Sequence, residues 1–129
     1  MISFDSFCLQ DGIPIYQQIL IFLKRGIVSG VIETGDELPS RRVLSALLGI
    51  NPNTVQKAYR ILEEQGFIQS HAGAKSCMVL DDEKIEAIGR ELLENEARGM
   101  IRSLRQMGVT QQQAHVLIDT FWQENEELP

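Results

Sequence analysis

The chain has 129 residues, enough for one modest hydrophobic core with a small appendage, and it contains no apolar run long enough to span a bilayer. Together with the lack of a leader-like start, this indicates a cytoplasmic protein. The formal net charge of −6 argues against a general polyanion binder, but residues 1–80 carry seven basic and seven acidic side chains, so the excess acid lies wholly in residues 81–129.

The first predicted elements are an arm and a helix. Residues 1–12 are expected to form an arm, in which Phe4 and Phe7 dock either on the domain itself or on a partner subunit. A helix is predicted from about Pro14 to Ser29. Its apolar positions recur at helical spacing and are Ile15, Ile19, Leu20, Phe22, Leu23 and Ile27. We expect this helix to pack behind the segment that follows.

Residues 38–66 predict two short helices that meet at a tight turn. Ser40 is placed to cap the first helix, and Gly49 ends it. The apolar stripe predicted for this helix is Val43, Leu44, Leu47 and Leu48. Asn51 is placed to cap the second helix, with Pro52 at its first position, where a missing N–H is harmless. The pattern is that of a helix-turn-helix, whose second helix presents its N-terminal residues to DNA bases; a helix pair without a DNA role is the alternative.

Two short apolar segments after this pair predict a β-hairpin. Residues 67–70 and 76–80 are expected to be strands, and residues 71–75 the turn between them. A helix-turn-helix followed by a hairpin is a winged helix. The turn holds His71, a flexible Gly73 and Lys75, a composition suited to contact with phosphate or the minor groove.

From Asp81 onward the sequence predicts two amphipathic helices and no strand. Gly108 separates them, and Thr110 with Gln113 predicts a capping box at the start of the second. Two helices of this size cannot bury both apolar stripes against each other, so we expect a two-fold homodimer. The residues assigned to dimerisation are Ile88, Leu92, Met100, Leu104, Leu117, Phe121 and Trp122. A small-molecule effector would have to occupy a gap at this interface, although methionines and aromatic residues at helical spacing more often fill a core.

The expected fold is therefore mainly α with a small β-hairpin. Residues 1–80 are assigned to a winged helix-turn-helix with an N-terminal arm, and residues 81–129 to a helical dimerisation region. Cys8, Cys77, His71 and His115 have no companion ligands at metal-binding spacing, so neither a metal nor a cofactor is expected. Both cysteines are expected to be packed thiols, with a redox switch as the alternative.

Roughly from Pro14 to Val79, the sequence resembles the GntR-type bacterial transcription regulators. The family pattern reads G-D-x-L-P-S-x-R-x-L-A, then G-V/I-x-x-x-T-V, then E-E-x-G-L/F-I. The corresponding segments of this chain are GDELPSRRVLS at residues 35–45, GINPNTV at residues 49–55 and EEQGFI at residues 63–68. The run NPNTVQKAY and the short C-terminal region are most similar to the YtrA-like subfamily.

The resemblance implies DNA contacts at particular positions. Arg42 matches a family arginine that contacts phosphate or guanine, while Arg41 replaces a residue that is more often acidic and either adds a phosphate contact or is a solvated charge. The second helix is implied to contact DNA through Asn51, Asn53, Thr54, Gln56 and Lys57. The wing is implied to do so through His71, Gly73 and Lys75.

Several departures from the family pattern affect what is expected of these contacts. Pro52 stands where some relatives have a base-reading arginine, so base reading should rest on amides and hydroxyls. In the wing, Lys75 replaces a glycine and Cys77 an aromatic residue, which leaves the geometry of the turn open.

The function that the resemblance implies is a homodimeric repressor, which binds double-stranded DNA at an inverted-repeat operator in its own operon. In relatives such operons often encode ABC transporters. A winged helix that serves as a protein-interaction module without specific DNA binding is the alternative. An enzyme is not expected, because the sequence has no cluster of nucleophile, base and orienting residue and no phosphate-cradling glycine loop.

Overall fold

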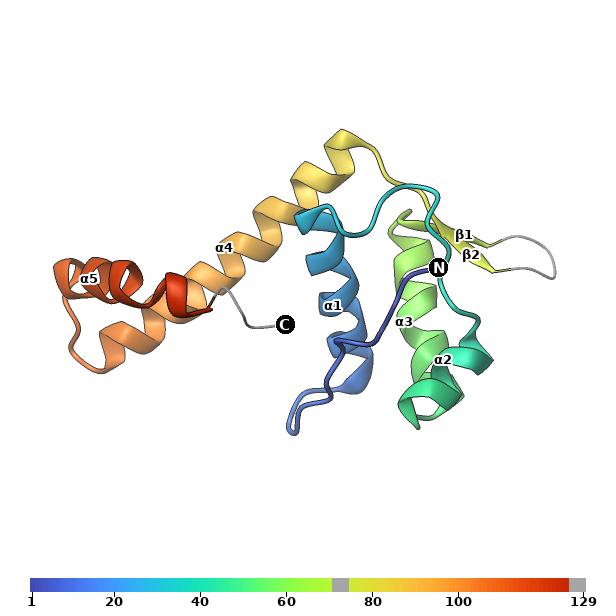
Figure 1. The fold of residues 1–129 in the computed structure, drawn as a ribbon, viewed down its shortest axis with the longest axis horizontal. Coiled ribbons are helices and arrows are strands. Elements are labelled where there is room, and N and C mark those ends of the chain that lie inside the picture. The colour runs from blue at the N-terminus through green and yellow to red at the C-terminus, as the bar shows by residue number, and fades with distance from the viewer. Residues whose placement is uncertain (71–74, 126–129) are drawn as a thin grey trace. The chain divides into compact units, whose positions relative to one another are not determined.

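The computed structural model describes residues 1–70 and 75–125, and within them the chain is mainly helical with one hairpin (Figure 1). The elements in chain order are α1 (Ile15–Ser29), α2 (Arg41–Leu48), α3 (Pro52–Glu64), β1 (Ile68–Ser70), β2 (Ser76–Met78), α4 (Asp82–Gln106), α5 (Gln111–Phe121) and the short 3-10 helix η1 (Gln123–Asn125). The predicted fold class, a winged helix-turn-helix with C-terminal helices, is confirmed. The chain divides into two compact units, residues 1–90, called here the winged unit, and residues 91–129, called the C-terminal unit.

The caps predicted from local sequence form as expected. Ser40 Oγ accepts a hydrogen bond from the Val43 N–H at 3.2 Å, and Asn51 Oδ1 accepts one from the Asn53 N–H at 2.8 Å. Pro52 is the first residue of α3. Gly49, in the turn, has a φ of 64°, a left-handed conformation that glycine adopts without strain. These local interactions hold α2 and α3 in the helix-turn-helix geometry.

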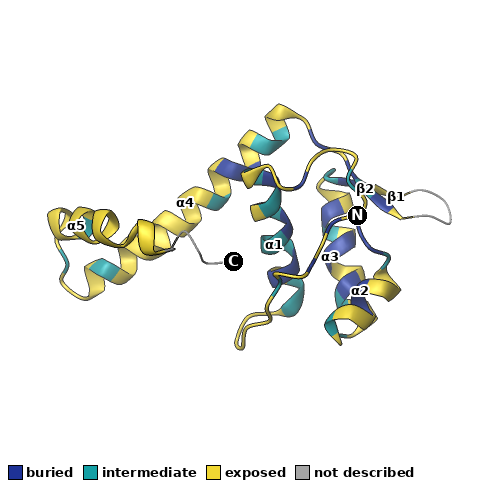
Figure 2. Cartoon of the chain, viewed as in Figure 1, coloured by how far each residue is buried: buried dark blue, intermediate teal, exposed yellow. Residues whose placement is uncertain are grey.

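The core of the winged unit lies between α1, α2 and α3 (Figure 2). Its fully buried side chains include Ile19, Leu23, Ile27, Leu38, Leu44, Val55, Ala58 and Leu62. The apolar stripe predicted for α2 is wrong at two positions, because Val43 is 47% and Leu47 67% exposed. With only eight residues, α2 buries one narrow face against α3, and that face contains Leu44.

The N-terminal arm docks on its own domain. Ile2 and Phe4 are buried in the core, and the Ile2 N–H donates to the Glu37 carbonyl at 2.8 Å. The Phe4 ring stacks on Phe22 of α1, with centroids 5.0 Å apart, and Phe7 contacts both rings edge-on. Of the two predicted locations, the domain is therefore the one that the arm occupies.

The hairpin is shorter than predicted. Antiparallel pairing joins Ile68 to Met78 and Ser70 to Ser76, so Phe67, Val79 and Leu80 lie outside the strands. The segment before α2 also pairs with β2, since the Leu38 N–H donates to the Ser76 carbonyl at 2.8 Å. This pairing fixes the base of the wing beside the start of α2.

The first turns of α4 belong to the winged unit, whereas the predicted boundary at residue 80 placed them in the dimerisation region. Lys84 Nζ donates to the Gly66 carbonyl at 2.7 Å and to the Val79 carbonyl at 3.2 Å. Ile88 is 5% exposed and belongs to the core of the winged unit. The assignment of Ile88 to dimerisation therefore needs correction, because its side chain is already buried within its own chain.

In the C-terminal unit, the capping box predicted at the start of α5 is present. Thr110 Oγ1 accepts from the Gln113 N–H at 3.2 Å, and the Gln113 side chain accepts from the Thr110 N–H at 2.9 Å. No residue of α5 is buried. None of the helices in residues 1–70 and 75–125 is both long enough and apolar enough to cross a membrane.

Candidate nucleic-acid interface

The N-terminal half of α3 presents polar side chains on one side and core residues on the other. Asn53, Gln56 and Lys57 are exposed, and Thr54 is half-buried. We call these four residues the reading face. The opposite side is anchored by Val55, Ala58, Tyr59 and Leu62, all buried. Because the buried side fixes the rotation of α3, the reading face is held outward without contributing to the core.

Asn51 has a structural role that limits what it can do at DNA. Its side-chain oxygen is engaged in the helix cap, while its amide N–H₂ remains a donor. Asn51 can therefore donate to a phosphate or base without leaving the cap, while the cap already uses one of the two acceptor positions of its oxygen.

Arg41 and Arg42 open α2 and are both exposed. The N-terminus of a helix carries partial positive charge, so two cations there reinforce the local positive field. Among the described residues neither arginine takes part in an ion pair. Both guanidinium groups are thus available to an external anion such as a backbone phosphate.

Tyr59 of α3 is buried and connects this helix to Pro39, the residue before the α2 cap. Its hydroxyl donates to the Pro39 carbonyl at 2.7 Å. Burial raises the pKa of the Tyr59 phenol, and the nearby Arg41 charge lowers it to a smaller extent. The phenol therefore remains a neutral donor, and a DNA contact from Tyr59 is excluded by its 2% exposure.

Of the three DNA-contact residues predicted in the wing, Lys75 lies among the described residues. Lys75 Nζ lies 3.8 Å from Glu37 Oε2, and both side chains are about half exposed. An exposed pair of this kind contributes little stability, so a phosphate can compete for the ammonium. His71 and Gly73 lie outside the described residues.

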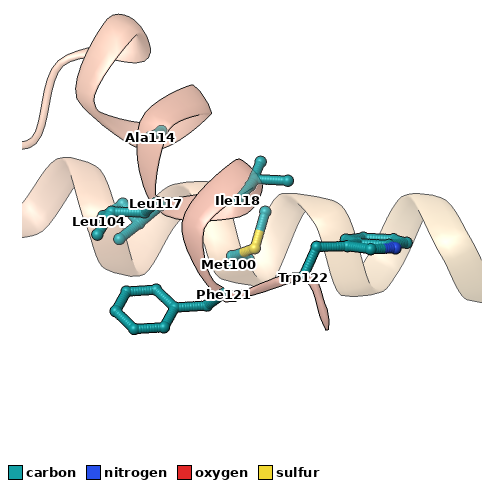
Figure 3. A pocket seen from close by; sticks show the side chains of 7 residues that line it. All are labelled: Met100, Leu104, Ala114, Leu117, Ile118, Phe121 and Trp122. Atoms are coloured by element: carbon teal, nitrogen blue, oxygen red, sulfur yellow. The ribbon is translucent and has the colours of Figure 1, made fainter. Parts of the chain in front are cut away.

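A second surface lies in the C-terminal unit, where α4 and α5 border a hollow of about 560 Å³. Its lining, called here the apolar face, is Met100, Leu104, Ala114, Leu117, Ile118, Phe121 and Trp122 (Figure 3). Five of the seven residues assigned to dimerisation are among them. Of the other two, Leu92 is half-buried on α4 and Ile88 is in the core of the winged unit.

The cysteines and His115 have simpler environments. Cys77 is half-buried in β2, but Cys8 is exposed, so the expectation of a packed thiol is wrong for Cys8. The arm turns its phenylalanines inward and leaves the following residue in solvent. His115 is exposed on α5 and does not line the hollow.

Comparison with known proteins identifies the family. The model of the bacterial regulatory proteins of the gntR family matches residues 15–76, which span α1 to the start of β2. YtrA from Sulfolobus acidocaldarius, a GntR-family transcription factor of known structure, is 30% identical; the match covers 78% of this chain and 99% of that one, with a TM-score of 0.55. This chain belongs to the GntR family.

Two further GntR relatives show how far the similarity extends. The repressor YtrA of Bacillus subtilis is 41% identical over 73 residues, which are 57% of this chain and 54% of that protein, so the match spans about half of its length. A GntR family transcriptional regulator from Listeria monocytogenes has a TM-score of 0.77 and 29% identity, over 87% of this chain and 98% of that one. The resemblance to YtrA-type regulators is thus confirmed, and the family is one of transcription regulators with a DNA-binding helix-turn-helix.

Proposed function

We propose that this chain is a homodimeric repressor that binds an inverted-repeat operator upstream of its own operon. The observation that carries the proposal is the reading face, four polar side chains held outward at the N-terminal end of α3, together with Arg41 and Arg42 of α2, which form no ion pair with the described residues. In a helix-turn-helix these are the positions that meet base edges and phosphates.

The chemistry of the reading face favours mixed base contacts. Asn53 and Gln56 have amides that can bond adenine in two places, and the Thr54 methyl and hydroxyl suit thymine or either partner of a pair. With Pro52 at the first position of α3, that position offers no side-chain hydrogen bond. Arg41, Arg42 and Lys75 then supply the phosphate contacts that fix the reader on the duplex.

The occupant that we propose for the apolar face is the same face of a second copy. Trp122 is 71% exposed and Phe121 46% exposed, and none of the described residues that line the hollow is charged. Large exposed apolar patches mark interaction sites, and a two-fold pairing buries the same patch on both chains. Further exposed apolar residues of the unit, Ile101, Met107 and Val116, could extend the buried area.

In this proposal, dimerisation accounts both for the recognition of an inverted repeat and for repression. One winged helix reads only a few base pairs, whereas two copies related by a two-fold axis read both halves of an inverted repeat. The Bacillus subtilis relative is named as a repressor. A dimer bound across a promoter excludes polymerase by occupancy alone, so no additional domain is needed for repression.

The proposal is tested by footprinting the full-length protein on the DNA upstream of its own gene. We expect protection of two symmetric half-sites separated by about one helical turn or a multiple of it. Arg42→Ala should weaken binding by about tenfold or more through the loss of a charged contact. The matched control is Arg98→Ala, because Arg98 is exposed on α4, where it lies 3.5 Å from Glu94 one turn earlier on the same helix. Equal losses in the two variants would contradict the assignment of Arg42.

A protein-interaction module is the second candidate, and the acidic balance of the chain favours it. The sequence pI is about 4.9, which lowers the non-specific attraction to DNA. A module of this kind would bind its partner unchanged in the Arg42→Ala and Thr54→Ala variants. Loss of operator binding in both variants would favour the repressor over the protein-interaction module.

A further inference from the structure

A contact between α1 and α3 places one cation of the recognition helix. Lys57 Nζ lies 4.0 Å from the centroid of the Tyr16 ring, within the range of a cation–π interaction. Tyr16 is in the first turn of α1, outside the helix-turn-helix. The other cation of α3, Arg60, lies instead 3.9 Å from Glu64 one turn later on the same helix.

The ring of Tyr16 is the fixed partner in this contact. Tyr16 is half-buried and packs against the core of the winged unit. Its hydroxyl accepts a hydrogen bond from Gln17 Nε2 at 3.1 Å. Lys57, by contrast, is an exposed side chain with four rotatable bonds. The contact therefore reduces the conformational freedom of Lys57 more than that of Tyr16.

Lys57 lies on the side of α3 that faces outward. Residues three and four positions apart are neighbours on a helix surface, so Lys57 is adjacent to Asn53 and Thr54. A cation at this margin of the reading face is suited to a backbone phosphate next to the bases that Asn53 and Thr54 approach. Whatever orients Lys57 therefore affects how the reading face docks.

We propose that Tyr16 is a positioning residue for DNA binding, which holds the Lys57 ammonium at the margin of the reading face for contact with a backbone phosphate. The lysine is then already ordered before DNA arrives, and less conformational entropy is lost on binding. This proposal deepens the proposed function and rests on it. It gives α1 a role in DNA binding that acts through Lys57 of α3.

The test is a double-mutant cycle on DNA affinity with Tyr16→Leu and Lys57→Gln in the full-length protein. The probes are the upstream duplex and a random-sequence duplex of equal length, each at several salt concentrations. Lys57→Gln should reduce the slope of log affinity against log salt by about 1 on both duplexes, as expected for one lost phosphate contact. Tyr16→Leu should weaken binding about two- to fivefold in the wild-type background and have almost no effect in the Lys57→Gln background.

Two controls separate positioning from general structural damage. Tyr16→Phe keeps the ring and should bind within about twofold of wild type. Arg60→Gln removes a cation of α3 that does not contact Tyr16, so the effects of Tyr16→Leu and Arg60→Gln should be additive. Additive effects of Tyr16→Leu and Lys57→Gln, or tighter binding by Tyr16→Leu, would overturn the proposal, the latter because the ring would then be sequestering the lysine.

A second measurement needs no DNA. A lysine over an aromatic ring has its side-chain methylene proton resonances shifted upfield, so the Lys57 signals should be shifted in wild type and Tyr16→Phe and unshifted in Tyr16→Leu. Unshifted Lys57 signals in the wild type would overturn the positioning role. If the wild type binds the upstream and random duplexes equally, the repressor proposal fails by itself, while the cycle on the random duplex still decides the role of Tyr16.

Discussion

The winged unit and the C-terminal unit differ in where their apolar side chains lie. In the winged unit, α1, α2, α3, the first turns of α4, the hairpin and the arm enclose a shared core, with residues such as Leu23 and Leu62 fully buried. In the C-terminal unit, none of the residues of α5 is buried, and Trp122 and Met107 are each 71% exposed. Burial of apolar surface is the main force that stabilises a fold. The winged unit thus buries its apolar side chains within one chain, whereas the described part of the C-terminal unit leaves large apolar side chains exposed, which is why we propose a partner surface for it.

The largest expected effect is the loss of a core side chain from the winged unit. Leu62→Ala removes a fully buried side chain of α3 and should lower the free energy of unfolding by about 2–5 kcal/mol. Urea unfolding measures this. The matched substitution Leu93→Ala, at a position on α4 that is 63% exposed, should cost less than about 1 kcal/mol. Comparable losses would mean that the two units do not differ in the way described.

The next effect concerns the partner surface that we propose for the C-terminal unit. Leu117→Asp places a charge within the apolar face and should weaken dimerisation by about 100-fold or more. Sedimentation equilibrium measures the dissociation constant. Gln112→Asp, also on α5 but away from the hollow, serves as the control and should leave the dimer intact. A wild-type chain that stays monomeric at high concentration would remove the proposed role of the apolar face.

A smaller effect is expected where α4 joins the winged unit. Lys84→Met removes the hydrogen bonds from the ammonium to the Gly66 and Val79 carbonyls and should destabilise the fold by about 1–2 kcal/mol. Arg90→Met is the matched control, because Arg90 pairs with Glu86 on the same helix and both side chains are exposed. We expect at most about 0.5 kcal/mol for this control in urea unfolding. A loss in Lys84→Met no larger than in the control would show that α4 is not anchored by this contact.

The smallest effect tests the buried phenol. Tyr59→Phe leaves the Pro39 carbonyl without its donor and should cost about 1 kcal/mol at neutral pH. Because folding raises the pKa of Tyr59, the neutral phenol is favoured in the folded state. Its contribution is fully present below about pH 10 and is lost as the pH rises through the folded-state pKa. Urea unfolding between pH 8 and about pH 11 should show a decline that Tyr59→Phe reduces; an identical decline in both proteins would contradict the assignment.

Much of the local structure could be predicted from the sequence, because caps and turns depend on residues close together in the chain. Ser40, Asn51 and the Thr110–Gln113 box cap their helices as predicted. Gly49 ends α2 for the same local reason. Helix starts and stops of this kind are determined by hydrogen bonds between neighbours and by φ preferences.

The predictions that were wrong concern residues whose burial depends on parts of the chain that are distant in sequence. Leu47 has the spacing of a core residue but is exposed, because α2 meets the core along one narrow face. Ile88 has the spacing of the dimerisation stripe but packs into the winged unit, since the first turns of α4 lie against it. The contact between Lys57 and Tyr16 crosses from α3 to α1, and helical periodicity contains no signal for it. Of the candidate DNA contacts, the sequence indicated which side chains are polar, and the fold determines which of them face outward.

In the proposed complex two copies of the winged unit bind two half-sites, and titration of the full-length protein on its upstream DNA measures whether they do. Mass measurement of the complex together with a footprint gives both stoichiometry and symmetry. We predict two chains per duplex and two symmetric protected half-sites, with protection of both lost together in Leu117→Asp at concentrations that saturate the wild type. One chain on one half-site, or equal protection of all sequences, would contradict the proposal.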